Sequence, residues 1–170
     1  MTIMIRKEQA TDIGAIFALT EAAFLDEAHS SHTEQFIVDA LRRRGQLTVS
    51  LVADDSGDIV GHVAISPVAL SSGAVGWYGL GPISVSPARQ KRGIGGQLMR
   101  EALRILREQG AQGCVVLGDP AYYGRFGFRA HPGLVLPSIP PEYFQALAFG
   151  AETPVGEAVY DEASTPPRKP

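Results

Sequence analysis

Hydrophobic and polar residues alternate along this chain with the periods of two kinds of element. Apolar residues recur every three to four positions where a helix with one buried face is expected, and every second position where a half-buried strand is expected. The pattern predicts strands at 2–6, 47–53, 59–66, 75–85, 114–117 and 155–160, helices at 13–24, 31–44 and 93–109, and short helices or turns after Asp119 and after Pro141. The resulting order is β-α-α-β-β-β-α-β-α-β.

Local signals set the boundaries of these elements. The polar run 54–58, between two β-rich segments, is typical of a hairpin turn. Ser31 and Glu34 have the spacing of a capping box and are expected to open the second helix. Two glycines and a proline within 79–82 interrupt the third long strand, which predicts a bulge or a close approach of another backbone. The wholly apolar run 114–117 predicts a strand buried on both faces.

The length and composition favour a single globular domain. The chain has 170 residues, of which 45% are hydrophobic and 19% charged, and it contains no linker or internal repeat. We therefore expect one domain over 1–163 and a disordered tail at 164–170. Because Cys114 is the only cysteine, an intrachain disulfide is excluded, and the four histidines do not have the spacing of a metal-binding helix. No metal is expected.

The charge balance narrows the classes of partner. Fifteen Lys and Arg residues against eighteen Asp and Glu give a net charge of −3, whereas a nucleic-acid binder needs a basic surplus. The N-terminus has no apolar signal region, and the apolar runs are far shorter than the roughly 20 residues of a membrane span. We expect a soluble cytoplasmic protein with no nucleic-acid or membrane partner, either a monomer or a homodimer.

The segment that points to chemistry lies between the third long strand and the longest helix. The strand ends at Val85, and a polar loop then leads through the glycine-rich run 90–96 into the helix. The first N–H groups of a helix have no partner within the helix and carry partial positive charge, and glycines allow a ligand to approach the backbone. Arg89, Lys91 and Arg92 add positive charge. The run is therefore expected to bind a pyrophosphate.

Common nucleotide motifs fit this run badly. A Walker A loop requires Lys followed by Ser or Thr after the final glycine, whereas Gly96 is followed by Gln97. A Rossmann fingerprint requires a third glycine where this chain has Leu98, and it begins directly after the strand. A glycine-rich helix start without a ligand is the simpler alternative, but the glycines lower helix stability and that cost needs a compensating role.

These residues resemble the GNAT superfamily of acyl-CoA-dependent N-acetyltransferases. The resemblance rests on the strand 81–85 with the following Ser86-Pro87, the run 90–95, which is similar to the signature Q/R-x-x-G-x-G/A, the apolar strand 114–117, and the segment 123–128. It covers residues 3–132. The run 118–123 resembles a bacterial branch of the superfamily whose substrates are mostly unassigned.

The resemblance implies a fold that agrees with the predicted elements. This is an α/β fold of mixed α+β type, with a central, mostly antiparallel twisted sheet, one parallel pair of strands that splay apart, and helices on both faces. Its core would span residues 3–132. The splayed pair would be the strand that ends at Val85 and the strand that begins at Cys114, and the gap between them would admit the arm of the cosubstrate.

The resemblance also implies the roles of individual residues. Backbone groups of Ile83 and Val85, with Ser84 between them, would pair with the pantetheine arm of acetyl-CoA. The pyrophosphate of acetyl-CoA would be held by Gln90, Lys91, Arg92, Gly93, Ile94, Gly95 and Gly96. Tyr123 would stand near the thioester sulfur and donate a proton to the leaving thiolate, because a phenol with a pKa of about 10 is protonated at neutral pH. Tyr122 is the second choice, and a packed aromatic role beside Phe126 and Phe128 is the alternative.

The base that would deprotonate the acceptor amine is not assigned. A lysine-like amine has a pKa of about 10.4, so its deprotonation at pH 7 costs about 4.6 kcal/mol. Many family members use a carboxylate near the strand before the pyrophosphate loop, but the strand 75–85 contains neither Asp nor Glu. The remaining candidates are Glu27, His29, His32, His62 and Asp119. Of these, His62 also fits an ordinary position on a strand face, and Asp119 a turn or helix cap.

Other chemistry-bearing residues have simpler interpretations. Cys114 lies in an apolar strand with no activating histidine nearby in sequence, so we interpret it as a core residue rather than a nucleophile. Trp77 and Tyr78 fit either an acceptor pocket or a packed sheet face. The three arginines 42–44 fit either an anion site or a solvated helix end, where cations suit the helix dipole.

Two functions remain open at this stage. The first is an N-acetyltransferase that uses acetyl-CoA and a small-molecule or protein amine. The second is a non-catalytic acyl-CoA-binding or sensor domain. The missing carboxylate slightly favours this second function, whereas Tyr123 favours the first, which is our prediction. Transfer of a longer acyl group is a further alternative, and the sequence does not identify the acceptor.

Overall fold

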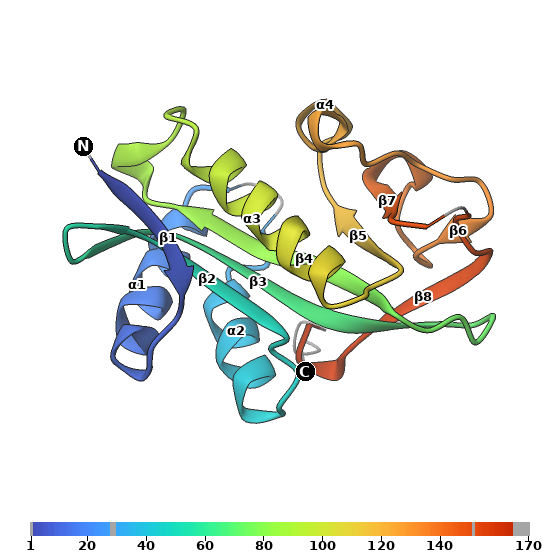
Figure 1. The fold of residues 1–170 in the computed structure, drawn as a ribbon, viewed down its shortest axis with the longest axis horizontal. Coiled ribbons are helices and arrows are strands. Elements are labelled where there is room, and N and C mark those ends of the chain that lie inside the picture. The colour runs from blue at the N-terminus through green and yellow to red at the C-terminus, as the bar shows by residue number, and fades with distance from the viewer. Residues whose placement is uncertain (1, 28–29, 151, 165–170) are drawn as a thin grey trace.

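A computed structural model describes residues 2–27, 30–150 and 152–164, and a mixed β-sheet forms its centre (Figure 1). The strands are β1 (Ile3–Lys7), β2 (Val49–Asp55), β3 (Asp58–Leu70), β4 (Trp77–Val85), β5 (Gly113–Leu117), β6 (Leu134–Val135), β7 (Phe144–Ala148) and β8 (Gly156–Tyr160). The helices are α1 (Ile13–Phe24), α2 (Glu34–Arg43), α3 (Ile94–Glu108) and α4 (Pro120–Tyr123). The main row of strands is β1-β2-β3-β4-β5-β7, and β8 pairs with both β3 and β6.

The pairing in the main row follows the predicted pattern. Every neighbouring pair is antiparallel except β4 and β5, which are parallel. The short pair β6–β8 is also parallel and was not predicted. The parallel pairing of β4 with β5 ends at Gly79 and Val115, although β4 continues to Val85 and β5 to Leu117. The predicted splay between these two strands is therefore present.

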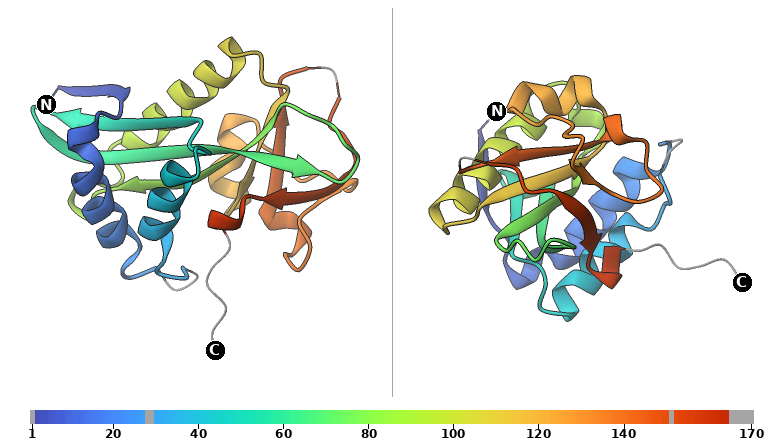
Figure 2. Two further views of the ribbon diagram at one scale, coloured as in Figure 1. Left: turned by 90° about the horizontal axis from the view of Figure 1, so that it is seen from below. Right: turned by 90° about the vertical axis from the view of Figure 1, so that its right-hand side faces the viewer.

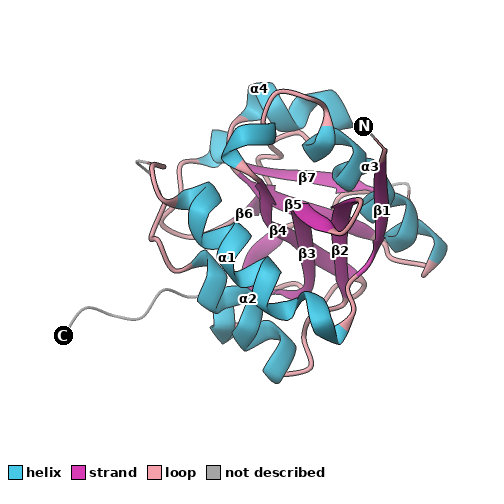
Figure 3. Ribbon diagram, turned by 90° about the vertical axis from the view of Figure 1, so that its left-hand side faces the viewer, coloured by secondary structure: helices cyan, strands magenta, loops and turns pink. Residues whose placement is uncertain are grey.

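Helices cover both faces of the sheet, as expected (Figures 2 and 3). On one face, Ile16 of α1 and Val38 of α2 pack against Val52 and Ala64 of the sheet. On the other face lies α3, whose buried residues recur at helical spacing and belong to the main core: Ile94, Leu98, Met99, Ala102, Leu103 and Leu106. Full burial of one such side chain contributes roughly 1.5–3 kcal/mol, so this stripe fixes α3 firmly on the sheet.

The C-terminal strands are the main departure from the predicted fold. The segment 144–148 forms β7, which pairs along the whole of β5. The surrounding prolines obscured this strand in the sequence, and a short 3-10 helix at 141–143 is all that follows Pro140 before it begins. Cys114 and Val116 pack in the core beneath α3 and Val115 packs in the cluster on the opposite face, so these three residues are fully buried, as predicted, whereas Leu117 at the end of the predicted strand is 46% exposed.

Several predicted boundaries are wrong or shifted; β2, for example, was predicted at 47–53 and spans Val49–Asp55. Helix α2 begins at Glu34 with Thr33 as its N-cap, so Ser31 does not cap it; the Glu34 carboxylate instead accepts a hydrogen bond from Ser30. Strand β3 extends beyond residue 66 to Leu70 because its last residues pair with β8. Of the predicted tail 164–170, Ser164 ends a short 3-10 helix and the remaining residues lie outside the described part of the chain.

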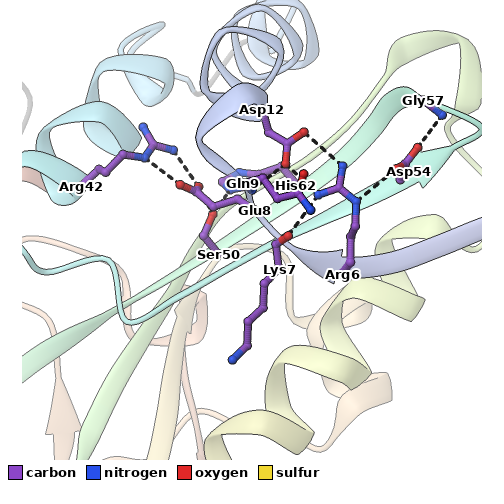
Figure 4. A network of polar contacts seen from close by, with 10 residues as sticks. All are labelled: Arg6, Lys7, Glu8, Gln9, Asp12, Arg42, Ser50, Asp54, Gly57 and His62. Atoms are coloured by element: carbon purple, nitrogen blue, oxygen red, sulfur yellow. Dashed lines mark hydrogen bonds and ion pairs between the residues drawn. The ribbon is translucent and has the colours of Figure 1, made fainter.

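A network of polar contacts joins α2 to the first three strands (Figure 4). The Arg42 guanidinium donates to both carboxylate oxygens of Glu8, at 2.7 and 2.9 Å. Ser50 on β2 donates to the same carboxylate, and its Oγ lies 2.8 Å from Nε2 of His62 on β3. With Arg44 paired to Asp161, two of the three arginines at this helix end form ion pairs, so the run is neither a free anion site nor merely a solvated helix end.

The network also determines the protonation of His62. Burial opposes ionisation of Glu8, but hydrogen bonds from Arg42 and Ser50 outweigh it and lower the pKa of the carboxyl. An ionised carboxylate only accepts hydrogen bonds, so the single hydroxyl proton of Ser50 goes to Glu8, and Ser50 accepts from Nε2–H of His62. Burial lowers the pKa of His62 to about 4; the Glu8 charge partly opposes this shift and the Arg42 charge adds to it.

This histidine makes folding stability depend on pH. Its pKa is about 4 in the folded protein, against an ordinary value of 6.5 for histidine, so the unfolded chain binds the proton first as the pH falls. The contribution of neutral His62 is fully present above pH 6.5 and is lost between pH 6.5 and 4, to a total of about 3 kcal/mol. Urea unfolding at pH 7, 5.5 and 4.5 measures this loss.

The variant His62→Gln isolates this effect, because an amide can still donate to Ser50 but does not titrate. We expect its loss of stability on acidification to be smaller than that of the wild type. His131→Gln removes a histidine outside the network and should follow the wild type. Equal slopes for the wild type and His62→Gln would show that His62 is not the titrating group.

Candidate functional site

The splay leaves one edge of β4 without a neighbouring strand. The Ser86 N–H donates to the Val60 carbonyl at 2.9 Å, directly after the pairing of Val85 with Gly61. In an antiparallel ladder the hydrogen-bonding direction alternates along a strand. Backbone groups of Ile83 and Val85 therefore point away from β3 toward the gap, whereas those of Ser84 point toward β3.

The side chains of these residues divide between the two faces of the sheet. Ile83 and Val85 pack against the core beneath α3. Ser84 is buried at 2% exposure, lies opposite His62, and its hydroxyl has no hydrogen-bonding partner among the described residues. Of the three residues predicted to line the arm, two present their backbone to the gap and the middle one does not.

The predicted bulge is present in β4. Between the pairs Val63–Ile83 and Ile65–Leu80, β4 contains one more residue than β3. The extra residue falls at Gly81–Pro82, where Gly81 has φ +143°. A bulge bends its strand and interrupts the ladder, so it accounts for part of the divergence of β4 from β5.

The edge of β4 leads to the first turn of α3. Gly93 is the N-cap residue with φ +81°, and it provides no side-chain cap. The Gln97 N–H bonds to the Gly93 carbonyl, so the N–H groups of Ile94, Gly95 and Gly96 precede the first bond within the helix. Lys91 also has a positive φ, +64°. Alternating backbone of this kind forms a concave array of N–H groups that suits an anion.

The charges around this turn differ in part from those expected. Lys91 and Arg92 are exposed and have no ion pair within the described ranges. Arg89, by contrast, bonds to Asp55 at 2.7 Å, which neutralises a predicted contributor. The Gln90 amide donates to the Val85 carbonyl at 3.3 Å, so it lies beside the gap edge. A further cation, Arg100, was not predicted; its guanidinium lies against Gly96 and over Phe126.

The two neighbouring tyrosines of α4 contact different parts of the candidate site. The Tyr122 hydroxyl lies 2.8 Å from the position that a Cβ on Gly95 would occupy, so it contacts the first turn of α3. The Tyr123 ring packs over Gly118, just after β5, and meets the edge of Phe128. Burial raises the pKa of Tyr123 to about 12, with smaller contributions in the same direction from Tyr122 and Asp119. The Tyr123 phenol is therefore protonated at neutral pH.

The described candidate bases do not gather at the gap: His62 lies opposite Ser84, but on β3, which borders β4 on the side away from β5. Asp119 is the N-cap of α4 and accepts from the Ala121 N–H at 2.9 Å. Glu27 and His32 are exposed near the α1–α2 connection, and His62 belongs to the network with Ser50. The fifth candidate, His29, lies outside the described residues. The structure thus supports the cap interpretation of Asp119, and it brings no described candidate carboxylate to the gap.

Cys114 and Trp77 are core residues. The Cys114 thiol is fully buried, and burial raises its pKa, so the thiolate that a nucleophile needs is disfavoured. Trp77 is 3% exposed and its ring packs directly on Gly113, as expected for a packed sheet face. Tyr78 is half-buried against the core beneath α3.

One aromatic residue near the gap had no signal in the sequence. Tyr160, the last residue of β8, places its ring over Gly79, where the pairing of β4 with β5 ends. A single apolar strand near the C-terminus gives no indication of where it pairs. This close approach explains the glycine at position 79, because a Cβ there would collide with the ring.

The described residues offer neither a metal site nor a membrane-spanning helix. No three His, Cys, Asp or Glu side chains among them are grouped so that they could hold a metal ion. None of the helices within these ranges combines the length and apolar character that crossing a membrane requires.

Comparison with known proteins identifies the family. The family model for the acetyltransferase (GNAT) domain matches residues 4–130. The N-acetyltransferase YhbS of Escherichia coli K12, itself uncharacterized, is 39% identical over 128 residues, which cover 75% of this chain and 74% of YhbS. The chain belongs to the GNAT acetyltransferases, as the resemblance of its motifs indicated.

Solved structures share the whole fold. A GNAT family acetyltransferase from Brucella melitensis, in complex with acetyl-CoA, is 51% identical with a TM-score of 0.86, covering 95% of this chain and 97% of that one. Escherichia coli YhbS in complex with CoA is 35% identical, also with a TM-score of 0.86, covering 95% of this chain and 91% of that one. Both similarities extend through the C-terminal strands.

Proposed function

We propose that this protein transfers an acetyl group from acetyl-CoA to an amine, with acetyl-CoA held in the gap between β4 and β5. One observation carries the proposal: the unpaired edge of β4 leads to the uncapped first turn of α3. The acetyl-CoA and CoA complexes of the two similar structures support it. A cytoplasmic location and a monomeric or homodimeric state are part of the same proposal.

The chemistry of the edge fits the arm of this cosubstrate. Pantetheine contains amide groups in an extended chain, which can add to a sheet edge as a further strand does. The backbone groups of Ile83 and Val85 supply the donors and acceptors for it, and Ser84 spaces them. In this arrangement Ser84 keeps its own backbone bonds to β3.

The chemistry of the following turn fits a diphosphate. The anion would meet the N–H groups of Gly93, Ile94, Gly95 and Gly96 at the positive end of the α3 dipole. Lys91 and Arg92 add long-range attraction, and Gln90 closes the turn beside Val85. A hydrogen bond to a charged group contributes about 1.5–3 kcal/mol, so a few such bonds suffice to anchor the ligand.

Tyr123 has the properties of a general acid for the transfer. The amine nitrogen forms a bond to the acetyl carbon, the carbon–sulfur bond breaks, and the sulfur takes the phenol proton. The new ammonium nitrogen then returns a proton to the phenolate, so the amide and free thiol form with no net change in Tyr123. Because burial holds the pKa of this phenol at about 12, the proton is present at neutral pH.

The diphosphate site is tested with matched glycine variants. Gly93 and Gly110 lie just before and just after α3, with φ +81° and +82°, and a Cβ on either would meet no atom within 4 Å. Alanine at either position should therefore cost similar stability, roughly 1–2 kcal/mol from the left-handed backbone. We expect Gly93→Ala to weaken CoA binding at least about 10-fold, which corresponds to the loss of one hydrogen bond to the diphosphate. Calorimetry of CoA binding measures this change.

Gly110→Ala should bind CoA as the wild type does. Equal affinities for the two variants would contradict a role of the α3 N-terminus in CoA binding.

The general acid is tested by thiol release from acetyl-CoA with a panel of small amines and lysine peptides. Tyr123→Phe keeps the ring on Gly118 and removes only the proton donor, so we expect kcat to fall about 100-fold while acetyl-CoA affinity is kept. Tyr143→Phe, at an exposed tyrosine, is the control and should have wild-type activity.

The same assay separates the two functions. Amine-dependent thiol release that is lost with Tyr123→Phe supports the enzyme. Tight acetyl-CoA binding without turnover on any amine of the panel would favour the sensor, the alternative to which the absence of a carboxylate on β4 points.

A further inference from the structure

The ring of Tyr160 occupies a defined position at the start of the gap. Tyr160 ends β8, where it pairs with Val68 of β3. A Cβ built on Gly79 would lie 2.5 Å from Cε1 of this ring and 3.1 Å from Val68. The ring therefore lies close against the β4 backbone at the last residue of β4 that pairs with β5.

Tyr123 lies on the β5 side of the gap, against Gly118, which follows β5 and is three residues beyond Val115, the partner of Gly79. A Cβ on Gly118 would lie 2.6 Å from Cε2 of its ring. The two rings belong to different faces of the sheet: Tyr123 packs with the core beneath α3, and Tyr160 packs with the cluster of Val68 and Trp77 on the opposite face. Two phenols thus flank the opening of the gap, each against a glycine that leaves room for it.

The hydroxyl of Tyr160 is not needed for this packing. Phenylalanine would fill the same space, and the Tyr160 side chain is only partly buried, so packing alone does not require a hydroxyl at this position. No hydrogen bond joins this hydroxyl to another residue in the described part of the chain. Burial raises the pKa of Tyr160, and Cys114 and Tyr123 raise it further, so the phenol is protonated at neutral pH.

We propose that Tyr160 is a second phenol of the active site, which donates a hydrogen bond to the acetyl carbonyl oxygen of acetyl-CoA while Tyr123 serves the sulfur. The inference rests on the proposed function. In a thioester the carbonyl carbon is bonded directly to the sulfur, so the sulfur and the carbonyl oxygen lie close together. If the Tyr123 hydroxyl reaches the sulfur from the α3 face of the sheet, the Tyr160 hydroxyl can reach the carbonyl oxygen from the opposite face.

The hydrogen bond would act on the charge that develops during transfer. As the amine nitrogen bonds to the carbonyl carbon, an electron pair moves onto the carbonyl oxygen. A fixed donor stabilises that oxygen most when its charge is greatest, which lowers the barrier rather than improving ground-state binding. Tyr160 keeps its own proton throughout, and the electron pair returns to carbon as the carbon–sulfur bond breaks.

The vibration of the carbonyl group tests this without an acceptor amine. We would bind acetyl-CoA carrying ¹³C at the carbonyl carbon and record isotope-edited infrared spectra of the wild type, Tyr160→Phe, Tyr123→Phe and Tyr143→Phe. A hydrogen bond lowers the carbonyl stretching frequency. We expect the frequency to rise in Tyr160→Phe and to keep its wild-type value in the other two variants.

The outcomes separate this inference from the proposed function. Binding of acetyl-CoA with the same frequency in the wild type and Tyr160→Phe would overturn the role of Tyr160 and leave the function intact. A frequency that rises in Tyr123→Phe instead would assign the donor to Tyr123 and overturn the inference. Failure of the wild type to bind acetyl-CoA would overturn both proposals.

A second variant and the kinetics guard against a purely structural effect. Gly79→Ala pushes the ring away while the hydroxyl is retained, so it should raise the frequency as Tyr160→Phe does. With any amine that the panel identifies, Tyr160→Phe should lower kcat at least about 10-fold and leave the KM for acetyl-CoA within about 2-fold. A change confined to KM would overturn the inference, because it would indicate a role in packing alone.

Discussion

The arrangement of this molecule depends on the hydrogen-bonding requirement of one strand. β4 bonds to β3 along most of its length but to β5 only as far as Gly79. Backbone N–H and C=O groups need partners when water is excluded from them. The bulge, the glycine-rich turn and the two tyrosine rings are all arranged around the unpaired edge, so the binding of an extended, amide-containing ligand follows from the same geometry that leaves the sheet incomplete.

Elements with strong local signals were predictable from the sequence, and elements fixed by distant partners were not. The apolar stripe of α3, the hairpin at 54–58 and the run 90–96 each carry their signal within a few residues. β7 and the extension of β3 to Leu70 exist because β5 and β8 pair with them. A short apolar run beside several prolines has no periodicity from which such pairing can be read.

The candidate site shows the same division. Its backbone part was predictable, because glycines and a strand end define where N–H groups are free. Its side-chain part was not: adjacent residues on a helix point about 100° apart, so Tyr122 meets Gly95 while Tyr123 meets Gly118. Arg89 was expected to add free positive charge, but it pairs with Asp55, the last residue of β2 and 34 positions away in sequence. Tyr160 lies outside residues 4–130, the range that the family model matches, so the family signature gave no indication of it.

The position of β7 has a consequence for how the protein behaves at high concentration. β5 is wholly apolar at Cys114, Val115 and Val116, and without β7 it would be the outermost strand of the sheet. An exposed, flat, hydrophobic edge is a template for chain-to-chain association and aggregation. The segment after residue 130 therefore covers the apolar edge of β5. A chain that ended at that point would be prone to aggregate even if its glycine-rich turn formed correctly.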